Sequence, residues 1–323
     1  MKHHLLRGGD SGNLTTAMKC LFGFLFVSLV LLVASCGQKS ETTSPKQADV
    51  TKTTAVSTQI FQVKGVVESV TLAEKTVRIR HEDIPGYMGA MTMPFEVRDT
   101  NELAGVNAGD AVTFRMIVTE TDGWIDQIKK LQGETAANPL PADAGIRIVR
   151  DVEPLEVGNM LPEYTFTNQL GQAVSLSQFR GQAVALTFIF TRCPFPTFCP
   201  LMSNNFRAVQ DALLNSPNAP TNWHLLTISF DPEYDTPEKL KNYAAGYHTD
   251  PARWSFLTGT LVDITALSEQ VGLQFWREPN GNISHNLRTV VVDAQGRLQK
   301  IFTENKWTTE ELKEEIVKAA GSK

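Results

Sequence analysis

Alternation of apolar and polar residues dominates the chain between residues 59 and 132. A period of two is the pattern of a β-strand with one buried face. It recurs in four segments, which are residues 61–67, 77–81, 91–97 and 111–118. Turn signals rich in Gly, Asn and Asp separate or follow these segments. Five short strands in all predict a small all-β, OB-like barrel over residues 59–132.

The pattern changes between residues 153 and 320, where apolar runs without alternation appear. The runs at residues 184–190 and 225–230 fit central strands that are buried on both faces. Residues 287–293 and 298–302 are predicted to form a hairpin across a Gly-containing turn.

Helix signals are interleaved with these runs. A helix is predicted from Pro200 onward, and another with Thr236 as N-cap and Pro237 in its first position. The capping box from Thr308 to Glu311 opens a last amphipathic helix. Alternating strands and helices with a terminal hairpin predict an α/β domain with a thioredoxin-like sheet.

The N-terminus has the pattern of a targeting segment. Lys19 precedes an apolar stretch, residues 21–33, which is too short to span a bilayer and suits a signal sequence. The stretch ends in Val33-Ala34-Ser35-Cys36, which resembles the bacterial lipobox. Residues 1–36 are therefore interpreted as a signal peptide whose Cys36 becomes lipidated. An ordinary signal peptide with a chance cysteine, or an uncleaved anchor, are the alternatives.

This interpretation predicts where the rest of the chain resides. Residues 37–58, rich in Ser, Thr, Lys and Gln, read as a disordered tether, and residues 133–152, with two prolines, read as a linker. Met18 is a candidate start, since residues 1–17 add nothing that a signal needs. The folded part is expected in the bacterial cell envelope, on the periplasmic side, anchored to the membrane by lipid.

Length and charge fit two ordinary domains. The chain has 323 residues, 20% of them charged, with a net charge of −5. This length allows two domains plus tails. Because no basic patch stands out, the sequence gives no reason to expect nucleic-acid binding.

Two of the four cysteines lie in the predicted α/β domain. Cys193 follows the buried strand, and Cys199 directly precedes Pro200 at the predicted helix start. Backbone N–H groups and the helix dipole stabilise thiolates in such a turn. A soft-metal site or a redox pair is favoured over a structural disulfide, since so short a loop stabilises little by chain entropy.

A third ligand for a metal must come from a histidine. His224 opens a predicted strand, and His248 lies near a helix C-terminus, so both have structural interpretations. His285 lies in a polar loop that leads into a strand, where a rigid scaffold can present a ligand. His285 is therefore the preferred candidate.

The barrel carries a second cluster of soft ligands. Met91 and Met93 point to one face of an extended segment, and His81 ends a neighbouring strand within reach. Thioethers are poor ligands for zinc and good ones for Cu(I). Methionines also fill gaps in cores, which is the alternative. Together the two clusters favour copper, as Cu(I), Cu(II) or both.

The α/β domain resembles a known family. Cys193, Cys199, the Phe-Asp-Pro-Glu-Tyr-Asp-Thr-Pro segment at residues 230–237 and His285 resemble the SCO/SenC family of thioredoxin-fold copper proteins. The resemblance covers residues 153–320 and implies copper bound by the two cysteines and the histidine. Five residues separate the cysteines, where the family motif has three. Asp231 matches an acidic family position, with a supporting role near the metal or helix capping as alternatives.

The barrel resembles the small periplasmic CusF-like copper-binding domain. This match rests on His81 and Met91-Thr92-Met93, within residues 62–131. That family caps its copper with a tryptophan three residues before the first methionine. Here the position is Met88, a candidate third thioether, and Tyr87 is a weaker candidate for the cap.

Together with the lipobox, the two resemblances imply a membrane-anchored copper chaperone, and they favour this role over that of an enzyme. The implied role is assembly of the dinuclear copper centre of cytochrome c oxidase. The implied partner is the copper-bearing subunit of that oxidase or another extracytoplasmic copper acceptor. A thiol–disulfide oxidoreductase that uses Cys193 and Cys199 as its redox pair remains an alternative. Copper tolerance by sequestration is another.

Overall fold

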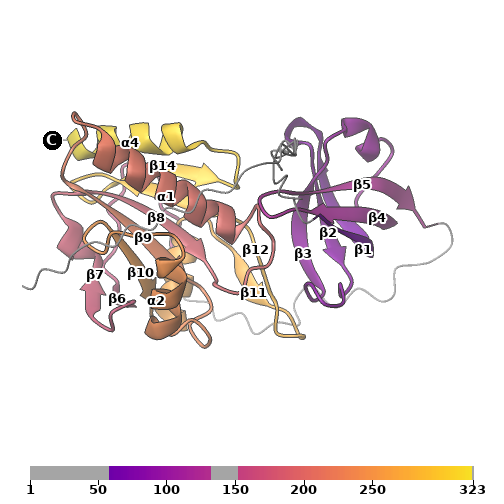
Figure 1. Ribbon diagram of the computed structural model, residues 1–323, viewed down its shortest axis with the longest axis horizontal. Coiled ribbons are helices and arrows are strands. Elements are labelled where there is room, and N and C mark those ends of the chain that lie inside the picture. The colour runs from indigo at the N-terminus through magenta and orange to yellow at the C-terminus, as the bar shows by residue number, and fades with distance from the viewer. Residues whose placement is uncertain (1–57, 132–151, 322–323) are drawn as a thin grey trace, which may run out of the picture. The chain divides into compact units, whose positions relative to one another are not determined.

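The structure is a computed structural model that describes residues 58–131 and 152–321 (Figure 1). We call these the β segment and the α/β segment. The predicted signal peptide lies outside the described residues, and so do the predicted tether and linker apart from their last residues. Among the described helices, none has the length and apolar character needed to cross a bilayer.

The β segment is a five-stranded antiparallel sheet in the order β3-β2-β1-β4-β5. Its strands are β1 (Gln59–Thr71), β2 (Thr76–His81), β3 (Met91–Glu96), β4 (Ala111–Val118) and β5 (Gly123–Lys130), with 3₁₀ turns η1 (Leu72–Glu74) and η2 (Thr100–Leu103). A parallel bridge between Val97 and Ile125 brings the two edges of the sheet together. The all-β prediction for this segment is confirmed.

The first strand is longer than its alternation predicts. The predicted strand covers residues 61–67, whereas β1 runs through to Thr71 and pairs with both β2 and β4. The pairing with β2 shifts between Val67 and Ser69. Such a bulge bends a strand and interrupts its period of two, so the second half carries no clear alternation.

The α/β segment is built on a seven-stranded sheet in the order β14-β13-β8-β9-β10-β6-β7. Its strands are β6 (Thr165–Asn168), β7 (Ala173–Ser175), β8 (Ala183–Ile189), β9 (Trp223–Ser229), β10 (Trp254–Thr258), β13 (Arg288–Val292) and β14 (Leu298–Thr303). The three central strands run parallel, and the outer pairs are antiparallel. This arrangement confirms the predicted thioredoxin-like α/β fold.

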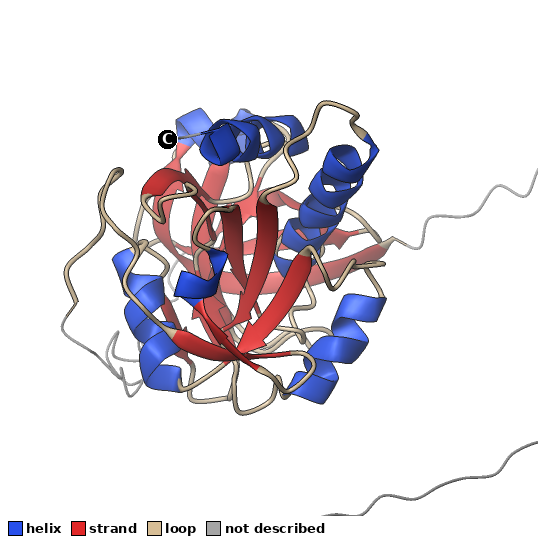
Figure 2. Ribbon diagram, turned by 90° about the vertical axis from the view of Figure 1, so that its left-hand side faces the viewer, coloured by secondary structure: helices blue, strands red, loops and turns tan. Residues whose placement is uncertain are grey.

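Helices cover both sides of this sheet (Figure 2). They are α1 (Cys199–Asn215), α2 (Pro237–Ala245), α3 (Leu261–Gln270) and α4 (Thr309–Gly321), together with the 3₁₀ turn η3 (Leu176–Phe179). A separate two-stranded hairpin, β11 (Phe275–Arg277) and β12 (Ile283–His285), lies outside the seven-stranded sheet.

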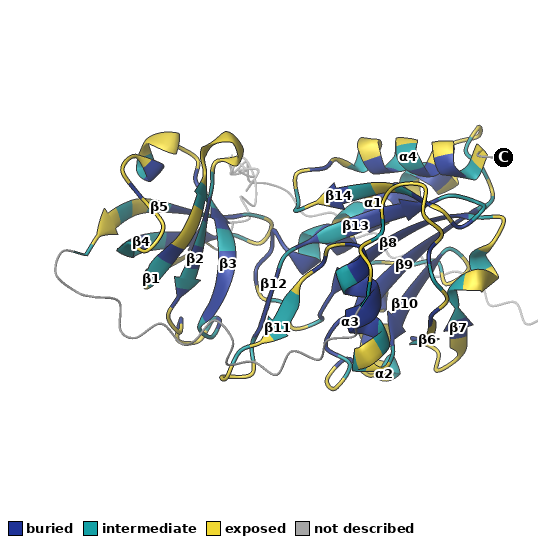
Figure 3. Ribbon diagram, turned by 180° about the vertical axis from the view of Figure 1, so that it is seen from behind, coloured by how far each residue is buried: buried dark blue, intermediate teal, exposed yellow. Residues whose placement is uncertain are grey.

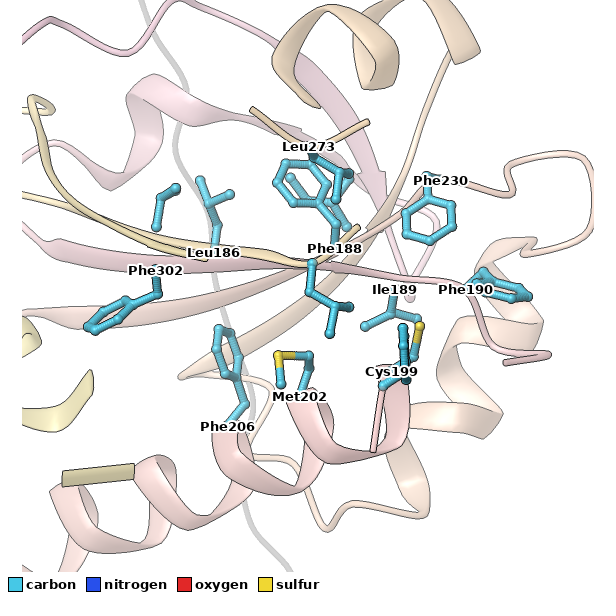
Figure 4. Packing of buried hydrophobic residues seen from close by; sticks show 14 of the residues in the cluster. Leu186, Phe188, Ile189, Phe190, Cys199, Met202, Phe206, Phe230, Leu273 and Phe302 are labelled. Carbon is cyan, nitrogen blue, oxygen red and sulfur yellow. The ribbon is translucent and has the colours of Figure 1, made fainter. Parts of the chain in front are cut away.

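The core of the α/β segment explains why its central strands show no alternation. Every residue of β8 and β9 is buried, because helices cover both faces (Figure 3). Leu186 and Phe188 from β8 are fully buried, as are Met202 and Phe206 of α1 (Figure 4). This packing fixes the carboxyl end of β8 against the start of α1.

Two helix starts form as the sequence predicts. The Thr236 hydroxyl accepts a hydrogen bond from the Lys239 amide, and Pro237 occupies the first helical turn. At α4, the Thr308 amide donates to the Glu311 carboxylate at 2.7 Å, and the Glu311 amide donates to the Thr308 hydroxyl at 3.2 Å. These reciprocal bonds are the predicted capping box.

We expect buried His224 to make the α/β segment sensitive to acid. Burial, assisted by nearby Arg253, lowers the pKa of His224 to about 4. An unfolded histidine titrates near 6.5. The free energy of unfolding is therefore not reduced by His224 above pH ~6.5. It falls by about 3 kcal/mol as the pH drops through 4, because the unfolded state then binds a proton that the folded state does not. Urea unfolding followed by tryptophan fluorescence between neutral and acidic pH measures this loss.

The matched variant is His224→Gln, whose amide can still bond the Ser255 hydroxyl that the histidine contacts at 2.9 Å. Glutamine does not titrate, so stability of the variant should depend less on pH over this range. Equal losses in both proteins would contradict the assignment to His224.

Candidate metal centres

The two cysteines and the predicted histidine come together at one end of the sheet. Cys193 lies in the turn after β8, Cys199 is the first residue of α1, and His285 is the last residue of β12. Their candidate ligand atoms all lie within 4.8 Å of one another. Both cysteines are free thiols. Among the described residues, this is the group of His, Cys and carboxylate side chains arranged to hold a metal ion.

Cys199 is positioned by the strand-to-helix connection. Its helix begins directly after the β8 loop, with Phe198 as N-cap and a proline in the first turn. Figure 4 shows Cys199 at the start of α1, close to Ile189 at the end of β8. The predicted setting at a helix start is therefore present, and Cys199 is fully buried.

The two thiols differ in their electrostatic environment. Although burial acts to raise it, interactions with Cys199 and His285 hold the pKa of Cys193 well below its usual range. Burial and the adjacent Cys193 raise the pKa of Cys199 well above its usual range. The two sulfurs are therefore inequivalent, and Cys193 is the one that ionises more readily.

His285 lies in a strand, not in the loop that the sequence predicts. The three-residue strand β12 pairs with β11, placing His285 opposite Phe275. His285 is 6% exposed, and its imidazole lies among three phenylalanine rings. Its centroid is 5.6 Å from Phe190, 5.8 Å from Phe198 and 5.0 Å from Phe230. These rings shield the site from water.

The hydrogen bond of His285 fixes which nitrogen can bind a metal. Its Nδ1 lies 2.9 Å from the carbonyl oxygen of Asn286. A carbonyl can only accept, so Nδ1 carries the proton and Nε2 keeps a lone pair. Such a bond orients a metal-binding histidine and sets its tautomer.

The other two histidines of the α/β segment do not join this group. His224 is buried beside Ser255 and packs on Phe179, with ring centroids 4.7 Å apart. His248 follows α2 with a left-handed backbone, and its carbonyl accepts a bond from Gln210. The contacts of His224 agree with its structural interpretation, whereas the interaction of the His248 imidazole with the helix dipole stays a prediction.

Asp231 lies close to the site but does not cap a helix with its side chain. It is fully buried, and its carboxylate accepts bonds from Arg192 and Arg277. Thr236 caps α2 instead. Sequence reasoning identified neither arginine, because nothing in the local pattern relates them to Asp231.

In the β segment, His81 and the methionines share one face of the sheet. His81 ends β2 directly opposite Met91 in β3, and Ile79 is opposite Met93. Met88 lies in the connection between these strands, where it bridges to Ile84. The predicted juxtaposition of His81, Met91 and Met93 on adjacent strands is therefore present.

The His81 imidazole has a free nitrogen in a buried position. Its Nδ1 donates to the Glu82 carbonyl at 2.7 Å, while Nε2 has no hydrogen-bond partner within the described part of the chain. Burial lowers the pKa of His81 despite the opposing bond to Glu82. A buried lone pair on a residue that is paired with Met91 fits a soft metal ion and otherwise lacks a partner.

Tyr87 is committed to another contact. Its ring stacks on Phe61 with centroids 4.8 Å apart. One face of the Tyr87 ring is therefore occupied, which favours Met88 over Tyr87 as the extra group at this site.

Residues 153–321, just over half of the chain, match the family model described as SCO1/SenC. The chain belongs to the SCO1/SenC family. Among its relatives, the SCO1 protein homolog of Bacillus subtilis is 38% identical over 142 residues, covering 43% of this chain and 71% of the homolog. A putative copper-binding protein of Stutzerimonas stutzeri is 29% identical over 143 residues, covering 43% and 67%.

Solved structures of the family resemble this SCO1/SenC chain over about half its length. A SCO1/SenC family lipoprotein from Bacillus anthracis is 26% identical, covers 50% of this chain and 96% of its own, and has a TM-score of 0.46. BsSco, described as a member of the Sco family of cytochrome c oxidase assembly proteins, is 27% identical. It covers 53% of this chain and 98% of its own, with a TM-score of 0.45.

The β segment has its own match. Residues 60–130 fit the family model described as copper binding periplasmic protein CusF. Both predicted resemblances, to SCO/SenC and to CusF, are thus confirmed, and the two matches support copper as the metal of this SCO1/SenC chain.

Proposed function

We propose that the chain is a copper chaperone of the cell envelope that delivers copper to an extracytoplasmic acceptor. The preferred acceptor is the copper-bearing subunit of cytochrome c oxidase, where the delivered copper would be built into the dinuclear copper centre. A lipid on Cys36 would hold the protein at the membrane. The observation that carries the proposal is the convergence of Cys193, Cys199 and His285 within 4.8 Å.

The donor set explains how such a site can both hold and release copper. Two thiolates and an imidazole suit Cu(I) and Cu(II) alike. Three protein donors leave copper able to accept a further ligand from an acceptor, so one donor can be exchanged at a time. Stepwise exchange of this kind transfers the metal without releasing a free ion. The phenylalanines around His285 limit competition from water.

The β segment supplies a second site of different character. His81, Met91 and Met93, with Met88 nearby, form a donor set without a thiol. Thioethers do not form disulfides, so this site keeps its ligands in an oxidising compartment. It would therefore capture Cu(I) under conditions in which the cysteines are oxidised.

One observation favours a second function, thiol–disulfide exchange. The low pKa of Cys193 beside the raised pKa of Cys199 resembles the pairing of an attacking thiolate with a resolving thiol. The attacking sulfur would have to reach a partner, and Cys193 is the more exposed of the two. Copper tolerance by sequestration rests on copper binding alone.

Deletion of the gene in its host separates these functions. A chaperone deletion leaves the oxidase without copper in its dinuclear centre at limiting copper, and added copper restores it. Complementation with the wild-type gene restores the centre, whereas Cys199→Ala does not. Full oxidase assembly in the deletion strain, with loss only of copper tolerance, would establish sequestration instead. Rapid reduction of acceptor disulfides by the copper-free protein, with no copper transfer, would establish the oxidoreductase.

A further inference from the structure

A buried carboxylate joins the two segments of chain that carry the cysteines and His285. Asp231 is 0% exposed. One of its oxygens accepts from Arg192 Nη2 at 2.5 Å, and the other accepts from Arg277 Nη2 at 2.7 Å. Each oxygen therefore holds a different arginine, and the arginines come from different parts of the fold.

The positions of these arginines connect Asp231 to the ligands. Arg192 directly precedes Cys193 in the turn after β8. Arg277 is the last residue of β11, the strand whose Phe275 pairs with His285. Because the β11–β12 hairpin is not part of the seven-stranded sheet, sheet hydrogen bonds do not fix its distance from the cysteine turn. The bonds to Asp231 bridge that gap.

Further contacts orient each arginine, that of Arg192 with the loop that carries Asp231 and that of Arg277 within its own hairpin. The Arg192 guanidinium lies 4.0 Å from the centre of the Tyr234 ring. Arg277 donates from Nη1 to the Gly281 carbonyl at 3.1 Å, within the turn of its own hairpin. Because Arg192 adjoins Cys193 in the chain and Arg277 is bonded within the hairpin that carries His285, a movement of either guanidinium displaces a segment with a candidate ligand.

The energetics favour keeping both bonds. A buried carboxylate that loses a cationic partner pays a large desolvation cost, so the pair of arginines is strongly retained. The arginines are 43% and 40% exposed at their side chains, so they keep part of their hydration. The buried Asp231 carboxylate is thus held in place, whereas the two partly exposed guanidinium groups are freer to move.

Asp235 has a different role nearby. Its carboxylate accepts from the Thr191 amide at 3.0 Å and from the Ser229 hydroxyl at 2.5 Å. These contacts secure the ends of two adjacent strands and do not reach the hairpin. Of these two aspartates, Asp231 is the one whose carboxylate bonds to both the cysteine turn and the hairpin that carries His285.

We propose that Asp231 is a positioning residue, which sets the distance between the cysteine turn and His285 through Arg192 and Arg277. This inference rests on the proposed copper site. Loss of the Arg277 arm frees the hairpin and weakens the imidazole ligand, while both thiolates remain. Loss of Asp231 frees both segments.

The test compares variants of the full chain loaded with Cu(II). Arg277→Met should shift the charge-transfer spectrum towards that of His285→Ala and lower copper affinity about tenfold, as loss of a supporting contact at a metal site does. Arg277→Lys keeps a cation for Asp231 and should therefore recover part of the wild-type spectrum and part of the copper affinity. Asp231→Asn should have at least the effect of Arg277→Met. The double variant Asp231→Asn with Arg277→Met should lose less binding free energy for copper than the sum of the losses in the two single variants.

A control and a copper-free measurement complete the test. Asp293→Asn makes the same change from carboxylate to amide at the opposite end of β13, where Oδ1 accepts from the Gln295 and Arg297 amides, and it should leave the spectrum unchanged. In the copper-free protein, Arg277→Met should speed hydrogen exchange in β12. If the wild-type chain binds no copper, the proposed function fails, while the exchange experiment still tests the link. Wild-type spectra, affinity within about twofold and unchanged exchange in folded variants would overturn the role of Asp231.

Discussion

A chain carrying Cys199→Ala should bind no copper at the cysteine site and should lack thiolate-to-copper charge-transfer absorption. The substitution leaves Cys193 and His285, one thiolate and one imidazole, which cannot hold the metal tightly. Cys193→Ala should have the same result for the same reason. His285→Ala keeps both sulfurs, so it should weaken binding and alter the spectrum without abolishing it. Titration with Cu(II), followed by visible absorption and metal analysis, measures all three.

The spectral band makes this test selective. Thioether and imidazole donors of the β segment contribute no thiolate transition, so the band reports only the cysteine site. Ser203→Ala is the matched control, since Ser203 is fully buried one turn further along α1 and its hydroxyl contacts the Tyr243 hydroxyl. It should retain copper despite a cost in stability. Unchanged spectra in both cysteine variants would remove these residues from the site.

Met91→Leu combined with Met93→Leu should lower the Cu(I) affinity of the β segment by more than roughly 100-fold, beyond what supporting residues of a metal site usually contribute. Leucine replaces methionine at similar volume, which usually costs less than about 1.5 kcal/mol of stability. The sheet should therefore fold while both sulfurs are lost. Competition with a Cu(I) chelator measures the affinity, in a chain whose Cys193 and Cys199 are already replaced by alanine.

The β segment offers a close control for this prediction. Met116→Leu changes a fully buried methionine on β4 that is not part of the cluster, and should leave Cu(I) affinity unchanged. Zinc should not compete in either protein, because thioethers are poor zinc ligands. An affinity that survives the double substitution would show that Met91 and Met93 serve only the core.

Local signals in the sequence predict much of the site. The apolar run ending at Phe190, the two cysteines and Pro200 specify a buried strand that turns into a helix. Each signal lies within a few residues of the structure it determines. The pairing of His81 with Met91 is predictable for a similar reason, because alternation fixes the face to which each side chain points.

The elements missed by the sequence depend on tertiary contacts. The strand β12 has three residues and contains Ser284 and His285, too short and too polar to show a period. Its partner is set by long-range packing, so the histidine reads as part of a loop. The bonds of Asp231 to Arg192 and Arg277 join residues 39 and 46 positions apart, beyond any local pattern.

The two candidate ligand histidines make the same kind of hydrogen bond, and this affects how each site tolerates mutation. His81 and His285 both donate from Nδ1 to the carbonyl of the next residue, Glu82 and Asn286. Every amino acid supplies that carbonyl, proline included. Substitution at either neighbouring position therefore leaves the acceptor available, and the tautomer is protected from most single-codon changes. The residues that follow His81 and His285 can therefore change during evolution while Nε2 of each histidine stays available to a metal.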